Sequence, residues 1–189
     1  MGSGATCFNA AQMSILGWAA PVATISAASL PAGRWVTFEI PALSANPYNN
    51  LLVKPTWLPN LSSGPDARNL FVSYRAPVGC DKLISKAFLG MVELHSLILN
   101  FPESMPFANN ITTLEAVVAP RTIWPAPAQR SLDGWRLAVR FVEQGPLSAS
   151  APWARVAICR YDVTRETGRC NNGLDDDCDG LTDLEDSDC

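Results

Sequence analysis

The chain has 189 residues, of which 48% are hydrophobic and 17% are charged, with six cysteines and a formal net charge of −4. This composition is sufficient for one compact domain with a sizeable core, and it excludes an intrinsically disordered chain. The acidic balance counts against a nucleic-acid-binding protein, and no run of about 18 uncharged apolar residues is present to form a membrane-spanning helix.

The first predicted element is a short helix over residues 9–16, and most of the elements that follow are strands. Runs rich in aromatic and β-branched residues alternate with clusters of Pro, Gly and Asn, as strands alternate with turns. Because Pro55 lies inside the second of these runs, we expect that strand at a sheet edge or a bulge. A second short helix is expected around 81–88. The expected strands span 35–40, 50–57, 69–75, 90–99, 113–118, 134–143 and 153–160.

The segment 134–143 has the clearest strand pattern. Arg136 and Arg140 fall on one face of it, and apolar residues fall on the other, namely Trp135, Leu137, Val139 and Phe141. Strands of this kind with turn signals between them favour an all-β fold. We therefore predict an antiparallel β-sandwich with a short N-terminal helix.

The chain contains one histidine, His95. A catalytic zinc site takes two or three histidines, or cysteines and carboxylates that leave one coordination position open. A Ser-His-Asp catalytic triad would depend on His95 alone. Residues 92–97 alternate between apolar and polar side chains, as a half-buried strand does. We therefore expect His95 to be a strand residue and not a catalyst.

The six cysteines are even in number and lack the paired short spacings of a zinc site, so we expect disulfides. Their connectivity stays open, because fifteen pairings are formally possible. Two glycosylation sequons begin at Asn60 and Asn110, both in predicted loops. Together these features favour an extracellular protein over a cytosolic one with reduced cysteines. The cysteines are Cys7, Cys80, Cys159, Cys170, Cys178 and Cys189.

The tail differs in charge from the rest of the chain. Residues 1–169 carry 14 basic and 10 acidic side chains, whereas the last 20 residues carry eight acidic side chains and no basic one. If Asp175 is position 1 of a twelve-residue calcium loop, oxygen donors fill every ligand position and Gly180 is the turn glycine. The alternative is a solvated acidic run. The expected Ca²⁺ ligands are Asp175, Asp177, Asp179, the carbonyl of Leu181, Asp183 and Asp186.

Helices of the EF-hand type do not flank this loop, because cysteines and asparagines occupy those places. We therefore predict a small calcium-loop tail framed by disulfides. Asp186 at position 12 is shorter than the usual glutamate, which weakens bidentate ligation.

The tail is similar to cysteine-framed, Asp-rich metal-binding segments of secreted multidomain proteins and to the calcium repeats of thrombospondins, although Leu184 stands where the common form has another cysteine. Short motifs in the body also occur in a recognisable order. They include 7–10, 16–18, 30–35, 41–42, 73–75, 92–95 and 158–160. Through these motifs the chain resembles the region after the catalytic core of gametolysin-like metallopeptidases, zinc endopeptidases of volvocine algae that digest cell-wall glycoproteins.

The resemblance implies a division of the chain into three parts. Residues 1–20 would correspond to the end of the catalytic domain, 21–165 to the β-sandwich and 166–189 to the calcium-binding tail. The family's zinc motif, His-Glu-x-x-His-x-x-Gly-x-x-His, is absent from this sequence. Zinc is therefore expected only in a catalytic domain outside this chain, and the chain alone is predicted to be inactive.

The functional hypothesis is a non-catalytic C-terminal domain of a secreted gametolysin-like metallopeptidase. Its expected partners are matrix or cell-wall glycoproteins or glycans, although no signal peptide is visible in the chain. The alternative is a structural or carbohydrate-binding module of an extracellular matrix, in which some of the six tryptophans would stack on sugars. A glycosidase is disfavoured because the ten acidic residues outside the tail form no paired motif.

Overall fold

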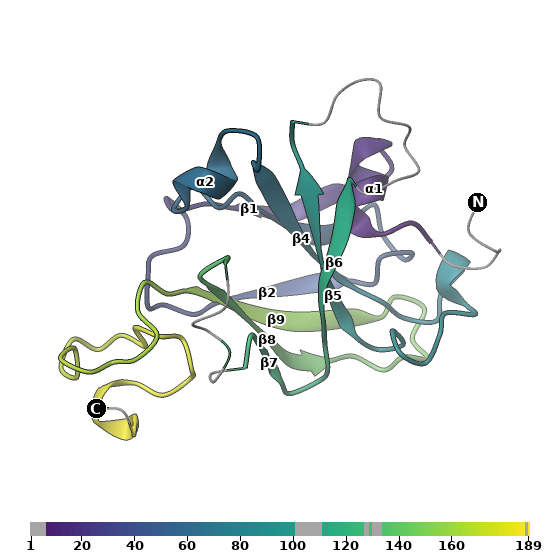
Figure 1. The fold of residues 1–189 in the computed structure, drawn as a ribbon. Coiled ribbons are helices and arrows are strands. Elements are labelled where there is room, and N and C mark those ends of the chain that lie inside the picture. The colour runs from purple at the N-terminus through teal and green to yellow at the C-terminus, as the bar shows by residue number, and fades with distance from the viewer. Residues whose placement is uncertain (1–6, 101–110, 127–128, 130–133, 188) are drawn as a thin grey trace.

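Two β-sheets packed face to face form the body of the protein (Figure 1). The structure is a computed structural model, and it describes residues 7–100, 111–126, 129, 134–187 and 189. One sheet has five strands in the order β1 (Ala20–Ile25), β3 (Tyr48–Val53), β4 (Arg68–Tyr74), β5 (Val92–Ile98) and β6 (Thr112–Val118). The other has four, in the order β2 (Val36–Pro41), β9 (Trp153–Arg160), β8 (Leu137–Gln144) and β7 (Ile123–Trp124). The predicted all-β sandwich is confirmed.

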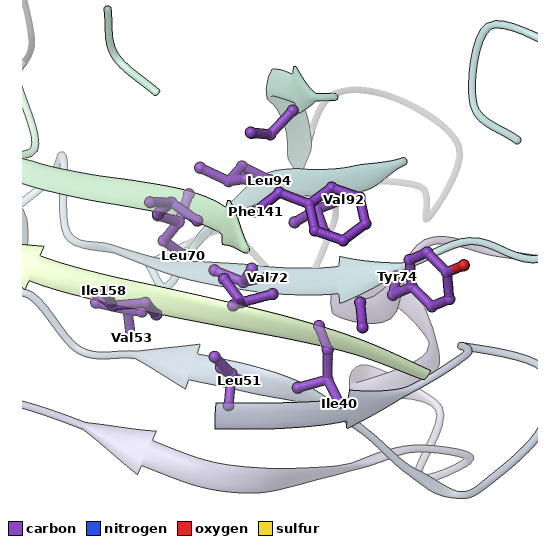
Figure 2. Close-up of a cluster of buried hydrophobic side chains, with 14 of the residues drawn as sticks. Ile40, Leu51, Val53, Leu70, Val72, Tyr74, Val92, Leu94, Phe141 and Ile158 are labelled. Atoms are coloured by element: carbon purple, nitrogen blue, oxygen red, sulfur yellow. The ribbon is translucent and has the colours of Figure 1, made fainter. Parts of the chain in front are cut away.

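The main hydrophobic core fills the space between the two sheets (Figure 2). Leu51, Val72 and Leu94 come from the five-stranded sheet, whereas Ile40 and Ile158 come from the four-stranded sheet. The alternation predicted for 134–143 is confirmed, because it buries four apolar side chains in this core: Trp135, Leu137, Val139 and Phe141. Arg140 lies on the opposite face of β8, where the tail docks.

The five-stranded sheet contains the main departures from the predicted strands. β1 was not expected, and it pairs parallel with β3, whereas the other strand pairs are antiparallel. Pro21 obscures the strand pattern of β1, and the sheet tolerates this proline because β1 is an edge strand. β3 ends at Val53, before Pro55, and lies between β1 and β4. The expectation that Pro55 marks an edge strand or a bulge is therefore wrong.

The predicted N-terminal helix is confirmed as α1 (Ala10–Ile15). Asn9 and Gln12 form a reciprocal capping box at its start, and Ala10 and Ala11 pack against the outer face of the five-stranded sheet. A short helix, α2 (Pro59–Ser62), begins with Pro59 in a segment predicted as a loop. None of the helices in the described part of the chain is long and apolar enough to cross a membrane.

The helix predicted around 81–88 is wrong, because this segment forms turns after a 3₁₀ helix over Gly79–Asp81. Asp81 accepts hydrogen bonds from Arg75 and from the backbone amide of Cys7, and Cys80 is bonded to Cys7. These contacts fix the start of the segment in a turn conformation, and the residues that follow carry no strong helical pattern to overcome it.

A buried polar cluster lies on the outer face of the five-stranded sheet, opposite the core. Arg75 makes ion pairs with Asp81 at 2.9 Å and with Glu93 at 3.0 Å, and His95 Nδ1 lies 3.8 Å from Glu93 Oε2. Burial lowers the pKa of His95 to about 4, and the charge of Arg75 adds to this shift. Burial raises the pKa of Glu93 against the opposing effect of Arg75. His95 is a residue of strand β5, as predicted.

We predict that the His95 imidazole titrates near pH 4 and not near the usual 6.5. The unfolded chain therefore takes up this proton before the folded protein does, and His95 favours unfolding as the pH falls from about 6.5 to about 4. Its full contribution is about 3 kcal/mol. The raised pKa of Glu93 acts in the opposite sense, so the direct measurement is the imidazole chemical shift of the single histidine. A midpoint near 6.5 would contradict the burial described here.

Candidate metal centre

Disulfides tie both ends of the chain to the sandwich. Cys159 of β9 is bonded to Cys178, which fastens the tail to the four-stranded sheet. A further bond, Cys170–Cys189, closes the tail on itself, and Cys7–Cys80 secures the segment before α1. All six cysteines are therefore paired, as predicted, in one of the connectivities that the sequence left open.

The tail loop docks beside the four-stranded sheet through Trp35 and Arg140 (Figure 1). Trp35 Nε1 donates a hydrogen bond to Asp175 Oδ2 at 2.6 Å. The Arg140 guanidinium lies over the Trp35 ring, 4.4 Å from its centroid, and donates to the carbonyl of Asp179 at 3.4 Å. The backbone amide of Asp175 donates to the carbonyl of Gly33 at 3.1 Å. The first residue of the expected calcium loop is thus fixed to the body of the protein.

Three of the expected ligands, Asp175, Asp177 and Asp179, form a first cluster, with carboxylate oxygens within 4.8 Å of one another. The loop wraps around Asp175, whose Oδ1 accepts from the amide of Asp179 at 2.9 Å and whose Oδ2 accepts from the amide of Gly180 at 2.8 Å. Gly180 has a φ of 100°, and a Cβ at this position would collide with the Arg140 guanidinium. The positive φ therefore requires a glycine at this turn, whereas the Arg140 side chain could move aside from a Cβ.

A second cluster consists of Glu166, Asp177 and Asp186, and it shares Asp177 with the first. Glu166 is fully buried, and its carboxylate accepts from the amides of Asp176 at 2.9 Å and Asp183 at 2.8 Å. Sequence reasoning missed Glu166, because it precedes the loop motif and its only signal is its proximity to Cys170. The structure thus brings a side chain from outside the loop to the same centre.

The remaining predicted positions lie outside both clusters in the described structure. The Asp183 carboxylate accepts from the backbone amides of Asn172 at 3.0 Å and Gly173 at 2.9 Å. Leu181 has an exposed side chain, and its amide donates to Asp179 Oδ1 at 2.8 Å. Of the two sequons, Asn60 is exposed in α2, and Asn110 lies outside the described residues.

Both clusters place several carboxylates in a largely buried environment. Burial raises the pKa of Asp175, although hydrogen bonds from Trp35 and Gly180 oppose the shift. Burial also raises the pKa of Glu166, and the charges of Asp186 and Asp175 add to this effect. A cation between such groups would offset both their desolvation and their mutual repulsion. The donors are hard oxygens, which suits Ca²⁺ better than a transition metal.

Comparison with known proteins places the chain in a family. Residues 1–114, more than half of the chain, match the sequence profile of the family described as Gametolysin peptidase M11. The chain belongs to this gametolysin family. The predicted resemblance is thereby confirmed.

A curated relative of this family member is the protein named Autolysin from Chlamydomonas reinhardtii. The two are 27% identical over 213 aligned residues, which cover 100% of this chain and 33% of the autolysin. The chain therefore spans one third of the length of that relative. No solved structure matches the chain.

Proposed function

We propose that this chain is a non-catalytic β-sandwich region of a gametolysin-family protein, and that its tail binds Ca²⁺. The observation that carries the proposal is the pair of carboxylate clusters that share Asp177. Their loop begins with a residue fixed by Trp35 and turns at a glycine with positive φ. Asp175, Asp177 and Asp179 would hold the ion, and Glu166 and Asp186 would complete the site or hold a second ion.

The chain has no residues from which a peptidase centre could be built in the manner of its family. The zinc-binding motif is absent from the sequence, and the single histidine is buried beside Glu93. We expect the purified chain to show no chelator-sensitive proteolysis when zinc is supplied. Activity that a point mutation within the chain abolishes would contradict a non-catalytic role.

We further propose that the protein works outside the cell, on or beside wall or matrix glycoproteins. Three disulfides support an oxidising compartment, since such bonds are rare in the cytosol. The family resemblance supports the choice of partner. Ca²⁺ is abundant in such a setting and would hold the acidic tail in its docked conformation.

Calcium is expected to stabilise the folded protein by mass action, by about 2.7 kcal/mol when its free concentration is a hundred times the dissociation constant. Asp177→Asn should remove most of this gain, because Asp177 belongs to both clusters. The matched control is Glu185→Gln, which changes an exposed carboxylate in the same tail that belongs to neither cluster. Thermal unfolding with and without calcium measures the effect. An equal calcium response in wild type and Asp177→Asn would contradict the proposed ligands.

A second candidate function, glycan binding, is favoured by a cleft of about 470 Å³ at the edge of the sandwich. Trp124 lines it beside Arg68, Glu115 and Asn60, which combines an aromatic surface with planar polar groups. A glycan array probed with wild type and with Trp124→Ala tests this function. Signals lost in the variant would support it, and an array without any signal would contradict it.

A further inference from the structure

We propose that a pocket on the outer face of the five-stranded sheet binds a primary ammonium group carried on an aliphatic stem, as in a lysine side chain. The pocket has a volume of about 330 Å³ and lies beside α1 and the 79–89 segment. Its polar lining includes Arg75, Glu93 and His95 of the buried cluster, together with Asn9, Gln12 and Ser85. Its apolar lining includes Ile84, Phe88 and Leu114.

The first argument is charge. Arg75 is the one cation of the buried cluster among the residues that the structure describes, and it contacts two carboxylates, those of Asp81 and Glu93. One guanidinium and two carboxylates leave a net charge of −1, and His95 is neutral at pH 7. The loop lysines, Lys82 and Lys86, are exposed to solvent. The cluster is therefore short of one positive charge in a place where an uncompensated charge is costly.

The second argument is an unused acceptor. His95 is 8% exposed, and its Nδ1 has no hydrogen-bond partner in the described structure. The 3.8 Å separation from Glu93 Oε2 is too long for a hydrogen bond between the two groups. A neutral imidazole with the proton on Nε2 presents Nδ1 as an acceptor. Glu93 and His95 both line the pocket, although the Nδ1 atom itself has almost no accessible surface. A small shift of the imidazole would bring this acceptor and the carboxylate to one ammonium with three N–H donors.

Charge and chemistry select among the possible ligands. An anion would face the Glu93 carboxylate, and the double charge of a divalent metal would lie next to the Arg75 guanidinium. A single positive charge neutralises the cluster, and the apolar lining from Ile84, Phe88 and Leu114 can hold a methylene stem. The ligand class that fits all three features is an alkylammonium, either free or as the end of a lysine side chain.

The test uses the one histidine of the chain as its reporter. Nα-acetyl-lysine amide and n-butylamine are titrated at pH 7 while long-range ¹H–¹⁵N correlation spectra follow the His95 imidazole. We expect saturable shifts with both probes if the ammonium and its stem suffice, and with the lysine amide alone if the pocket selects a peptide side chain. The neutral isostere, Nα-acetyl-norleucine amide, should cause no shift. Equal shifts with the isostere, or no shift with either amine across the millimolar range, would overturn the proposal.

Variants separate the charge effect from loss of structure. Glu93→Gln keeps an acceptor for Arg75 and leaves Arg75 paired with Asp81, so the fold should persist. Affinity for the lysine probe should fall by about tenfold or more, since hydrogen bonds to charged groups contribute about 1.5–3 kcal/mol. Glu39→Gln, the same change on the exposed face of β2, should leave affinity unchanged. Undiminished binding by Glu93→Gln, or an imidazole that responds to zinc but not to amines, would refute the proposed site.

Discussion

Replacing Phe141 with alanine is expected to lower the free energy of unfolding by about 3–5 kcal/mol. Phe141 is fully buried between the sheets and packs edge-to-face on Tyr74, with ring centroids 5.9 Å apart (Figure 2). The variant loses the transfer free energy of the ring and leaves a cavity that strands on both sides resist closing. Denaturant unfolding measures this loss.

The control for this change is the next residue of the same strand. Val142 is 36% exposed, so Val142→Ala should cost less than about 1 kcal/mol. If both variants lost the same free energy of unfolding, Phe141 would not be buried in the core between the sheets. The packing of the two sheets described here would then be wrong.

Removing the Cys159–Cys178 bond is the second large change. The double variant Cys159→Ala/Cys178→Ala should lose about 3 kcal/mol, because this bond closes a loop with a sequence separation of 19 residues in the unfolded chain. It should also release the tail from β9 and weaken the contact between Trp35 and Asp175. Near-ultraviolet circular dichroism and denaturant unfolding follow the two effects.

The matched control removes Cys170–Cys189, which has the same separation of 19 residues but lies wholly within the tail. This variant should keep the near-ultraviolet circular dichroism that the contact between Trp35 and Asp175 contributes (the Trp35 signal). The reason is that Cys159–Cys178 still fastens the loop to the sheet. Loss of the Trp35 signal in the control and its retention in the first variant would contradict the assigned roles of the two bonds.

The sequence predicted strands well where their side chains alternate and poorly where they do not. β8 and β9 carry a period of two that no competing signal obscures. β1 contains a proline, and its parallel pairing with β3 depends on a connection through β2 that no local pattern encodes. The turns at 81–88 follow from contacts of Asp81 with Arg75, which is six residues away, and with Cys7, which is 74 residues away in sequence.

The part of the candidate site that follows the spacing of the aspartates in the sequence was predictable. Alternate aspartates before a glycine bring Asp175, Asp177 and Asp179 together, because successive ligands in a tight turn point inward. Glu166 enters through the fold of the whole tail, which places its carboxylate against two backbone amides. Asp183 follows the same spacing, yet its carboxylate caps the amides of a neighbouring turn. Spacing alone cannot distinguish these cases.

Calorimetric titration with Ca²⁺ tests the central claim, that the tail is a calcium site, most directly. The account predicts saturable binding by the wild-type chain, a large loss of affinity in Asp179→Ala and little change in Glu185→Ala, since only Asp179 belongs to a carboxylate cluster. An absence of binding up to millimolar calcium, or equal damage from the two substitutions, would contradict it.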